Sequence, residues 1–376
     1  MNNRIYDYFG KDFIDNRIKC LSNNLKYDNV PFPYRVEIQP TSYCNRICKF
    51  CSHAARNSNH SELNESEVFN VLDTLNKMGC NNISFSGGGE PFEWRKGNLI
   101  NLINDYSSVM KITVTTNGDV YWNKDRFESK NLQLLKKCTA VIINVPEVTV
   151  DGFKRIATTN IDWGEEKKKL QNIVAYKKKY MLDCQICAVV VVSKLNIHDL
   201  VLIDKFLHEL DVDKIYYKNL KNYEDGRLDD IALDDNDLLL LSSYLNFNCS
   251  KSLVNFIKNL ASKKVDCIMS EPVDCWANQI ALSCIIDPNG EVYVCTPYVG
   301  NEKYSIGNIK KDSFDNIWNS KIHMRVIAKL NENAINDICP EECRFHAYNR
   351  ILDSYLNNNF NTESVYVNAG MDDNIQ

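Results

Sequence analysis

Three cysteines near the start of the chain, Cys44, Cys48 and Cys51, are spaced C-x3-C-x2-C in a loop rich in Thr, Ser and Asn. Three thiolates on a tight loop can each bind one iron of a [4Fe–4S] cubane, a cluster that normally takes four cysteines. A three-cysteine site leaves one iron open for another ligand, much as catalytic metal sites keep one open position. The alternatives are three unrelated thiols, or a zinc site completed by His53 or His60.

A glycine-rich segment, Gly87-Gly88-Gly89-Glu90-Pro91, directly follows the strand expected over 82–86. In parallel α/β folds, ligands bind at the carboxyl edge of the sheet, where such a segment would lie. Glycines let backbone groups approach a ligand closely, and the Glu90 carboxylate could accept a hydrogen bond from an ammonium group. On its own the segment is typical of a turn. Because it follows the cysteine loop by one β/α unit, its position indicates a ligand site.

The chain around these motifs alternates between strand patterns and amphipathic helix patterns. Strands are expected over 34–39, 82–86, 111–116, 139–145, 184–192 and 213–217, and helices over 64–78, 98–108, 125–137, 165–181 and 197–210. This alternation predicts an α/β fold with a parallel sheet. The number of units is about six, short of the eight in a closed barrel, so we expect a partial (β/α)6 TIM-like barrel.

The predicted barrel occupies residues 34–220 and is preceded by an N-terminal extension over 1–33. Residues 221–266 have the pattern of a helical connector. A small cysteine-rich domain is expected over 267–350, with short strands at 281–286 and 291–294 joined by a turn at 287–290. Residues 351–376 form a polar, Asn-rich and acidic tail.

The composition limits the partners and the location that we expect for this protein. The 376 residues include 15 cysteines and carry a net charge of −5, so nucleic acid and anionic membrane are not expected partners. No apolar run approaches the ~18–20 residues of a membrane span, and no secretory signal is evident at the N-terminus. We therefore expect a cytoplasmic protein with reduced thiols, in which cysteine clusters indicate metal binding or catalysis.

At this point the sequence resembles the radical S-adenosylmethionine (radical SAM) superfamily, through Cys44-Asn-Arg-Ile-Cys48-Lys-Phe-Cys51 and Gly87-Gly-Gly-Glu-Pro91. The resemblance implies that the open iron chelates the amino and carboxylate groups of S-adenosylmethionine. Reduction of the cluster would then release a 5′-deoxyadenosyl radical that abstracts a substrate hydrogen, while the protein orients and shields the cofactor. It also implies a flavodoxin- or ferredoxin-like electron donor.

The resemblance further implies which residues bind S-adenosylmethionine. Phe50 would lie by the adenine, and Gly88, Gly89 and Glu90 would contact the methionine amino group. Three more residues, each of which has the alternative of a polar strand end or a solvated charge, are Asn117, Asn144 and Arg155. Arg155 resembles the family's partner for the methionine carboxylate, because a guanidinium suits bidentate carboxylate binding.

The C-terminal part contains six further cysteines: Cys267, Cys275, Cys284, Cys295, Cys339 and Cys343. Their arrangement around the hairpin resembles the SPASM/twitch extension of radical SAM enzymes, which holds auxiliary iron–sulfur clusters. The resemblance implies one fully ligated auxiliary [4Fe–4S] cluster, held by Cys275, Cys295, Cys339 and Cys343. Cys267 or Cys284 could replace one of these ligands, and a four-cysteine structural zinc is the alternative.

A fully ligated cluster cannot bind substrate without losing a ligand, so we expect the auxiliary cluster to transfer electrons. This predicts an oxidoreductase that removes two electrons from a small molecule or carbohydrate, as twitch-containing alcohol dehydrogenases do. A general base is needed, and the candidates are His346, Tyr298 and Arg344. The alternatives are a maturase of a ribosomally made peptide, disfavoured because only 33 residues precede the first strand, and a non-catalytic metal-binding protein.

Overall fold

The structure is a computed structural model. It describes residues 31–53, 60–121, 130–158, 162–220, 226–269 and 273–336, with seven later residues: Cys339, Cys343, Phe345, Asn349, Arg350, Leu352 and Asp353. Side chains are described in these ranges except at 130, 131, 158 and 261–269. The described residues form two compact units. Unit 1 contains 31–37, 66–81 and the residues from 273 onward, and unit 2 contains 38–65 and 82–269.

Unit 2 is built on a parallel sheet. Its strands follow the order β3 (Asn82–Phe85), β4 (Lys111–Thr116), β5 (Ala140–Asn144), β7 (Gln185–Val192) and β8 (Lys214–Asn219). The strands are rich in Val and Ile, and their buried side chains form the core of the unit. The backbone carbonyl of Ile38, the last residue of β1 (Arg35–Ile38), accepts a hydrogen bond of 3.2 Å from the N–H of Ser86, just after β3. The predicted α/β fold with a parallel sheet is confirmed.

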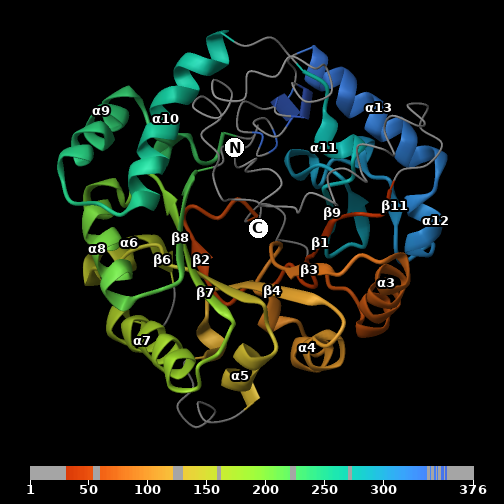
Figure 1. Ribbon diagram of the computed structural model, residues 1–376, viewed down its shortest axis with the longest axis horizontal. Coiled ribbons are helices and arrows are strands. Elements are labelled where there is room, and N and C mark those ends of the chain that lie inside the picture. The colour runs from red at the N-terminus through yellow and green to blue at the C-terminus, as the bar shows by residue number, and fades with distance from the viewer. Residues whose placement is uncertain are drawn as a thin grey trace, which may run out of the picture. The chain divides into compact units, whose positions relative to one another are not determined.

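Helices connect these strands and lie along the outside of the sheet (Figure 1). They are α4 (Leu99–Tyr106), α5 (Lys130–Gln133), α7 (Trp163–Lys179) and α8 (Leu200–Leu210). The Asn98 side chain caps α4, and Asp162 and Glu165 form a reciprocal capping box at the start of α7. The helix expected over 125–137 is a short α5 followed by the 3-10 turn η5 (Leu134–Lys136), while 122–129 lie outside the described residues.

Several short elements of unit 2 were not predicted from the sequence. They are β2 (Ile47–Cys48), η2 (Pro91–Glu93), η3 (Asp119–Tyr121), α6 (Val150–Ile156) and β6 (Ala157–Thr158). The helix expected over 197–210 begins with the 3-10 turn η6 (Ile197–Asp199) and continues as α8. Strands β2 and β6 form a separate antiparallel pair with Ile47 opposite Thr158 and Cys48 opposite Ala157. Elements this short have no periodicity to reveal them in a sequence.

The helical connector expected over 221–266 is present in the described part of that range. It consists of η7 (Asp229–Ile231), α9 (Asp235–Ser243), η8 (Tyr244–Asn246) and α10 (Lys251–Met269). The buried Asp204 of α8 accepts hydrogen bonds from the Tyr217 hydroxyl of β8, at 2.7 Å, and from the Ser250 N–H before α10, at 2.7 Å. These bonds fasten the connector to the last βα unit.

Unit 1 contains a run of neighbouring strands, three of which pair antiparallel, and several helices. In sequence order its elements are β1, α3 (Glu65–Met78), α11 (Trp276–Gln279), β9 (Ser283–Ile286), β10 (Glu291–Tyr293), η9 (Thr296–Tyr298), η10 (Glu302–Tyr304), β11 (Gly307–Asn308), α12 (Phe314–Trp318) and α13 (Lys321–Ile335). The strand order is β11-β10-β9-β1. Gly290 has a φ of +89° in the predicted turn between β9 and β10, where Asp287 accepts the N–H groups of Asn289 and Glu291.

The units are discontinuous along the chain, because most of β1 and α3 group with the C-terminal segment. The domains expected from the sequence were contiguous ranges, so these units do not correspond to them one to one. The expected domain limits stay a prediction. In the described part of the chain, none of the helices combines the length and the apolar character that crossing a membrane requires.

Candidate cofactor site

The three predicted cluster ligands lie together in the loop after β1. Cys48 is part of the β2–β6 pair, and the Cys51 N–H donates to the Cys48 carbonyl at 3.0 Å. All three thiols are half-buried and outside any disulfide. Burial is the largest cause that raises the pKa of Cys44 to about 11 and that of Cys48 to about 12, and the other cysteines of the loop contribute to both increases. Such thiols ionise only beside a strong positive charge, which a metal cluster provides.

The donor set of the cysteine loop is three thiols, the number that a cubane with one open iron requires. Among the residues that the structure describes, no group of three His, Cys, Asp or Glu side chains is arranged to hold one metal ion. In a cubane each thiolate binds a different iron, so the sulfurs surround the cluster at a wider spacing than around a single ion. The His60 ring lies 6.0 Å from the Tyr43 ring.

The glycine-rich segment packs against the backbone that leads into the cysteine loop. The N–H of Gly89 donates to the Thr41 carbonyl at 2.8 Å, and that of Glu90 donates to the Tyr43 carbonyl at 2.8 Å. A Cβ atom at Gly89 would lie 1.9 Å from the Tyr43 carbonyl oxygen. Gly88 has a φ of +61°, in the left-handed region that favours glycine. The chain's own backbone therefore makes the close approach at Gly89.

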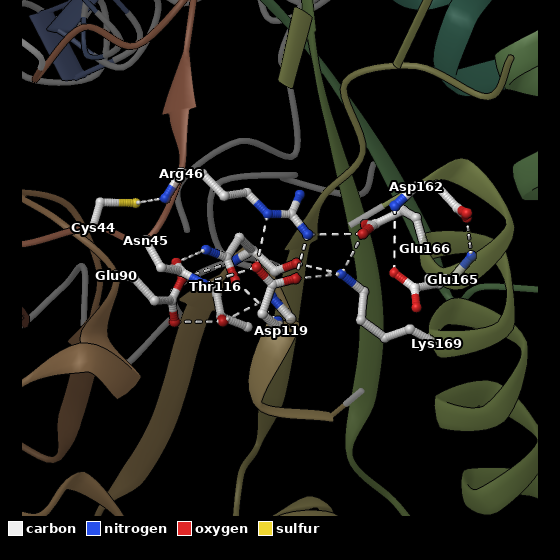
Figure 2. A network of polar contacts seen from close by, with 12 residues as sticks. Cys44, Asn45, Arg46, Glu90, Thr116, Asp119, Asp162, Glu165, Glu166 and Lys169 are labelled. Carbon is white, nitrogen blue, oxygen red and sulfur yellow. Dashed lines mark hydrogen bonds and ion pairs between the residues drawn. The ribbon is translucent and has the colours of Figure 1, made fainter. Parts of the chain in front are cut away.

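Glu90 joins this segment to the end of β4. Its carboxylate accepts hydrogen bonds from the Thr116 hydroxyl at 2.6 Å, the Asn117 N–H at 2.8 Å and the Phe92 N–H at 3.3 Å (Figure 2). Burial raises its pKa to about 7 in spite of these three donors. A carboxylate offers about four acceptor positions, so one further donor can still be accommodated. Its contact with a methionine amino group stays a prediction.

The other predicted polar contacts already have partners within unit 2. The Asn117 amide donates to the Asn45 side chain at 2.6 Å and accepts the Asp119 N–H at 2.9 Å. Arg155 donates to the Leu195 carbonyl at 2.8 Å and 3.2 Å. Its guanidinium also lies 3.6 Å from Asp199 and 3.8 Å from Glu147. Asn144 is half-buried at the end of β5. The roles of these three residues in binding S-adenosylmethionine stay predictions.

Phe50 forms part of an apolar wall next to the cysteine loop. It is buried against Ile156, Leu220 and Leu228, with the partly buried Cys48, Val191 and Leu195 packed against the same cluster. The wall thus combines the loop, the end of α6, and the segments that follow β7 and β8. Apolar side chains around an aromatic ring suit the face of a purine ring, and the contact of Phe50 with adenine stays a prediction.

A buried network that was not predicted from the sequence joins the cysteine loop to α7. Arg46, Asp119, Glu166 and Lys169 form it, and Figure 2 shows their side chains converging between the loop and the helix. Burial alone would raise the pKa of Asp119, but Arg46 and Lys169 hold it below its ordinary value. One signal was available, since positions 166, 169, 170 and 173 share a helical face on which two charges accompany apolar residues.

In unit 1, Cys275 lies at the N-terminus of α11. Its backbone N–H donates to the Asn331 side chain at 2.7 Å, and its sulfur accepts from the Asn278 amide at 3.2 Å. Burial is the largest cause that raises the pKa of Cys275 to about 12, and the Cys343 and Cys339 thiols contribute to the increase. These three predicted auxiliary ligands are therefore close enough for their charges to interact, and their binding of a cluster stays a prediction.

Tyr298 connects the fourth predicted ligand to this group. Burial raises the pKa of its hydroxyl, and Cys339, Tyr304 and Cys295 add to the increase. The Tyr298 ring stacks on Tyr304 at 3.9 Å between centroids, and the Asn333 amide donates to both hydroxyls, at 3.1 Å and 2.9 Å. A phenol with a raised pKa seldom exists as phenolate, which makes Tyr298 a poor base.

Four other residues named from the sequence bear on this site. Cys284 is fully buried on β9, and its thiol neighbour is Cys80, so the structure places it in the core of unit 1. The side chain of Cys267 is outside the described residues, as are the base candidates His346 and Arg344.

Comparisons with known proteins agree with this arrangement. Residues 38–207 match the model of the radical SAM superfamily, and residues 275–344 match the model of the SPASM iron–sulfur cluster-binding domain. The first match contains the cysteine loop and the glycine-rich segment. The second contains Cys275, Cys295, Cys339 and Cys343.

Solved structures with a similar fold include Streptococcus suis SuiB bound to the precursor peptide SuiA, with a TM-score of 0.61 and 15% identity over 85% of this chain and 71% of SuiB. Another is a histidine-tagged form of anSMEcpe with bound AdoMet, with a TM-score of 0.56 and 14% identity over 90% of this chain and 98% of the other. The chain is also 31% identical to the GTP 3′,8-cyclase of Campylobacter fetus subsp. fetus (strain 82-40) over 124 residues. That match spans 32% of this chain and about a third of the cyclase, 36% of its length.

Proposed function

We propose that this chain, which matches the radical SAM model over residues 38–207 and the SPASM model over residues 275–344, is an oxidoreductase that cleaves S-adenosylmethionine and abstracts a hydrogen atom from its substrate. The radical SAM domain implies a [4Fe–4S] cluster and S-adenosylmethionine, and the SPASM domain implies auxiliary iron–sulfur clusters. The observation that carries the proposal is the gathering of three half-buried thiols in one loop, which is hydrogen-bonded to the glycine-rich segment.

Cys44, Cys48 and Cys51 would hold the first cluster, and Cys275, Cys295, Cys339 and Cys343 would hold one auxiliary cluster. When bound, the first supplies the electron that converts S-adenosylmethionine to methionine and a 5′-deoxyadenosyl radical, and the second supplies an acceptor for an electron from the substrate. The chain itself shields the first site, because Phe50 and its apolar neighbours form a wall beside the cysteine loop.

The polar residues at the carboxyl edge of the sheet would bind the methionine part of S-adenosylmethionine. The remaining acceptor position of Glu90 suits the amino group, and Arg155 would exchange its contacts with Asp199 and Glu147 for the carboxylate. Arg155 can make this exchange because its side chain is 44% exposed. A fully buried guanidinium could not give up its protein partners in the same way, since nothing would replace them. Asn117 and Asn144 are the further candidates at this edge.

We expect the reaction to be a net two-electron oxidation of a small molecule or carbohydrate. Loss of a hydrogen atom to the radical, followed by loss of a proton and an electron, turns a substrate C–H bond into a new double bond or a new bond to a neighbouring atom. The proton needs an acceptor, for which Tyr298 is a poor choice because of its raised pKa. A flavodoxin- or ferredoxin-like protein is the proposed electron donor.

A polypeptide substrate is the second candidate. It is supported by two similar folds that were solved with peptides, SuiB with the precursor peptide SuiA and anSMEcpe with the Kp18Cys peptide. Neighbouring genes separate the two classes, since a short precursor-peptide gene favours a peptide and glycosyltransferase genes favour a carbohydrate.

Anaerobic reconstitution tests the proposal. Protein with both clusters should contain about eight irons per chain, and with dithionite it should convert S-adenosylmethionine to 5′-deoxyadenosine. The triple variant Cys44→Ala/Cys48→Ala/Cys51→Ala should retain about four irons and release no 5′-deoxyadenosine. Continued release from this variant would refute the assignment of the site.

A further inference from the structure

Four buried charges in unit 2, Arg46, Asp119, Glu166 and Lys169, form a closed and electrically neutral group that we call the charge quartet (Figure 2). The Arg46 guanidinium donates two hydrogen bonds to Asp119 and one of 2.7 Å to Glu166. The Lys169 ammonium donates to Glu166 at 2.6 Å and to Asp119 at 3.3 Å. The side chains of Arg46, Glu166 and Lys169 are at most 2% exposed. Burial of four charges is costly, and mutual pairing offsets part of that cost.

The charge quartet is attached directly to the cysteine loop. Arg46 lies between Cys44 and Cys48, and its backbone N–H points at the Cys44 sulfur at 3.5 Å. The preceding residue, Asn45, donates to Asp119 at 2.9 Å and accepts from Asn117 at 2.6 Å. Two successive loop residues are therefore held by the segment that follows β4.

The charge quartet is also attached to the scaffold of unit 2. Lys169 donates to the Asn117 carbonyl at 2.7 Å, so α7 is bonded to the end of β4. Glu166 lies in the first turn of α7, where the positive end of the helix favours an acidic side chain. The capping box at Asp162 fixes that turn. The loop is thus held by a helix and a strand whose own positions are set by core packing.

We propose that Arg46 is a positioning residue, and that the charge quartet fixes the cysteine loop and sets the reduction potential of the cluster held there. This inference rests on the proposed function, in which Cys44, Cys48 and Cys51 bind that cluster. The reduced cluster carries more negative charge than the oxidised one, so hydrogen bonds to its sulfurs and nearby positive charge both stabilise it and raise the reduction potential. The Arg46 N–H provides a hydrogen bond, and the balance of charge within the charge quartet determines the nearby charge.

The test is the reduction potential of the cluster whose EPR signal changes when S-adenosylmethionine is added, measured in reconstituted full-length protein. Arg46→Met removes a positive charge and should shift the potential to more negative values. Asp119→Asn removes a negative charge and should shift it to more positive values. The double variant restores neutrality and should return toward the wild-type value.

Two further variants keep the test decisive. Arg46→Lys keeps the charge without the bidentate guanidinium, so it should shift the potential less than Arg46→Met, and it serves if the Met variant does not fold. Lys178→Met removes an exposed lysine of the same helix, paired with Asp211, and should leave the potential unchanged. Shifts of one sign for Arg46→Met and Asp119→Asn, or no shift in either, would overturn the inference. Absence of any EPR change with S-adenosylmethionine in the wild type would instead refute the proposed function.

Discussion

The buried carboxyl group of Glu90 predicts a specific dependence of stability on pH. Its side chain is 4% exposed, and its pKa rises from an ordinary value of 4.5 to about 7 because burial disfavours the charged form. The folded protein therefore holds a proton on Glu90 over a pH range in which the unfolded chain has already lost it. The stability contributed by this proton is complete below about pH 4.5 and is lost as pH rises toward and beyond about 7.

The magnitude follows from the size of the shift. A difference of about 2.5 pKa units, at 1.36 kcal/mol per unit, corresponds to about 3 kcal/mol of unfolding free energy lost between pH 4.5 and pH 8. Glu90→Gln cannot ionise, so its unfolding free energy should lack this loss. The variant starts from a lower stability, because an amide NH2 replaces one acceptor among three donors.

The assay is urea unfolding of the cluster-free protein at several pH values between 4.5 and 8, for wild type and Glu90→Gln. The quantity to compare is the difference in unfolding free energy between the two proteins at each pH. The wild-type value minus the Glu90→Gln value should fall by about 3 kcal/mol as the pH rises across this range. Glu93→Gln, which removes a more exposed carboxyl from the same turn, is the matched control. A constant difference between wild type and Glu90→Gln would show that burial does not raise this pKa.

Three further predictions concern stability and metal content. Gly89→Ala should destabilise unit 2 by about 3 kcal/mol or more, because its Cβ would collide with the Tyr43 carbonyl, and wild-type stability in urea would contradict that geometry. Lys169→Met should lower the free energy of unfolding by about 3–5 kcal/mol, because it leaves the negative charges of Glu166 and Asp119 undercompensated. Lys178→Met, on the exposed face of α7, should change the urea midpoint much less, and equal effects of the two variants would be inconsistent with a buried network. Cys275→Ala should lower the iron content from about eight to about four per chain and leave 5′-deoxyadenosine release measurable, and an unchanged iron content would remove Cys275 from the ligand set.

The parallel sheet was predictable because its strands and helices have distinct periods. The expected strand over 111–116 coincides with β4, and the apolar positions Val68, Val71, Leu72 and Leu75 are the buried ones on α3. The two groups of cysteines were proposed as metal ligands for a different reason, because closely spaced thiols are typical of metal sites, and this assignment stays a prediction. Both kinds of signal are local in the sequence.

The charge quartet could not be predicted in the same way, because its members are far apart. Arg46 and Glu166 are separated by 120 positions, and the segment Glu165-Glu166-Lys167-Lys168-Lys169 is typical of a solvated helix surface. Only the tertiary structure reveals that Glu166 and Lys169 point inward while Lys167 and Lys168 do not. A second hint, besides the charges on the apolar face of α7, was a charged residue between two predicted cluster ligands, since such a side chain needs a partner when it is buried.

The glycine-rich segment shows how one motif can serve structure and binding at the same time. Its glycines are consistent with close approach of a ligand, yet the atom nearest to a Cβ at Gly89 belongs to the backbone of Tyr43, next to Cys44. The Glu90 carboxylate in turn accepts hydrogen bonds from Thr116 and Asn117 at the end of β4. The motif therefore holds the cysteine loop in place through backbone contacts. A substitution there should displace the cluster ligands even if it never touches S-adenosylmethionine, so loss of activity in a Gly89 variant is evidence for binding only if its iron content is unchanged.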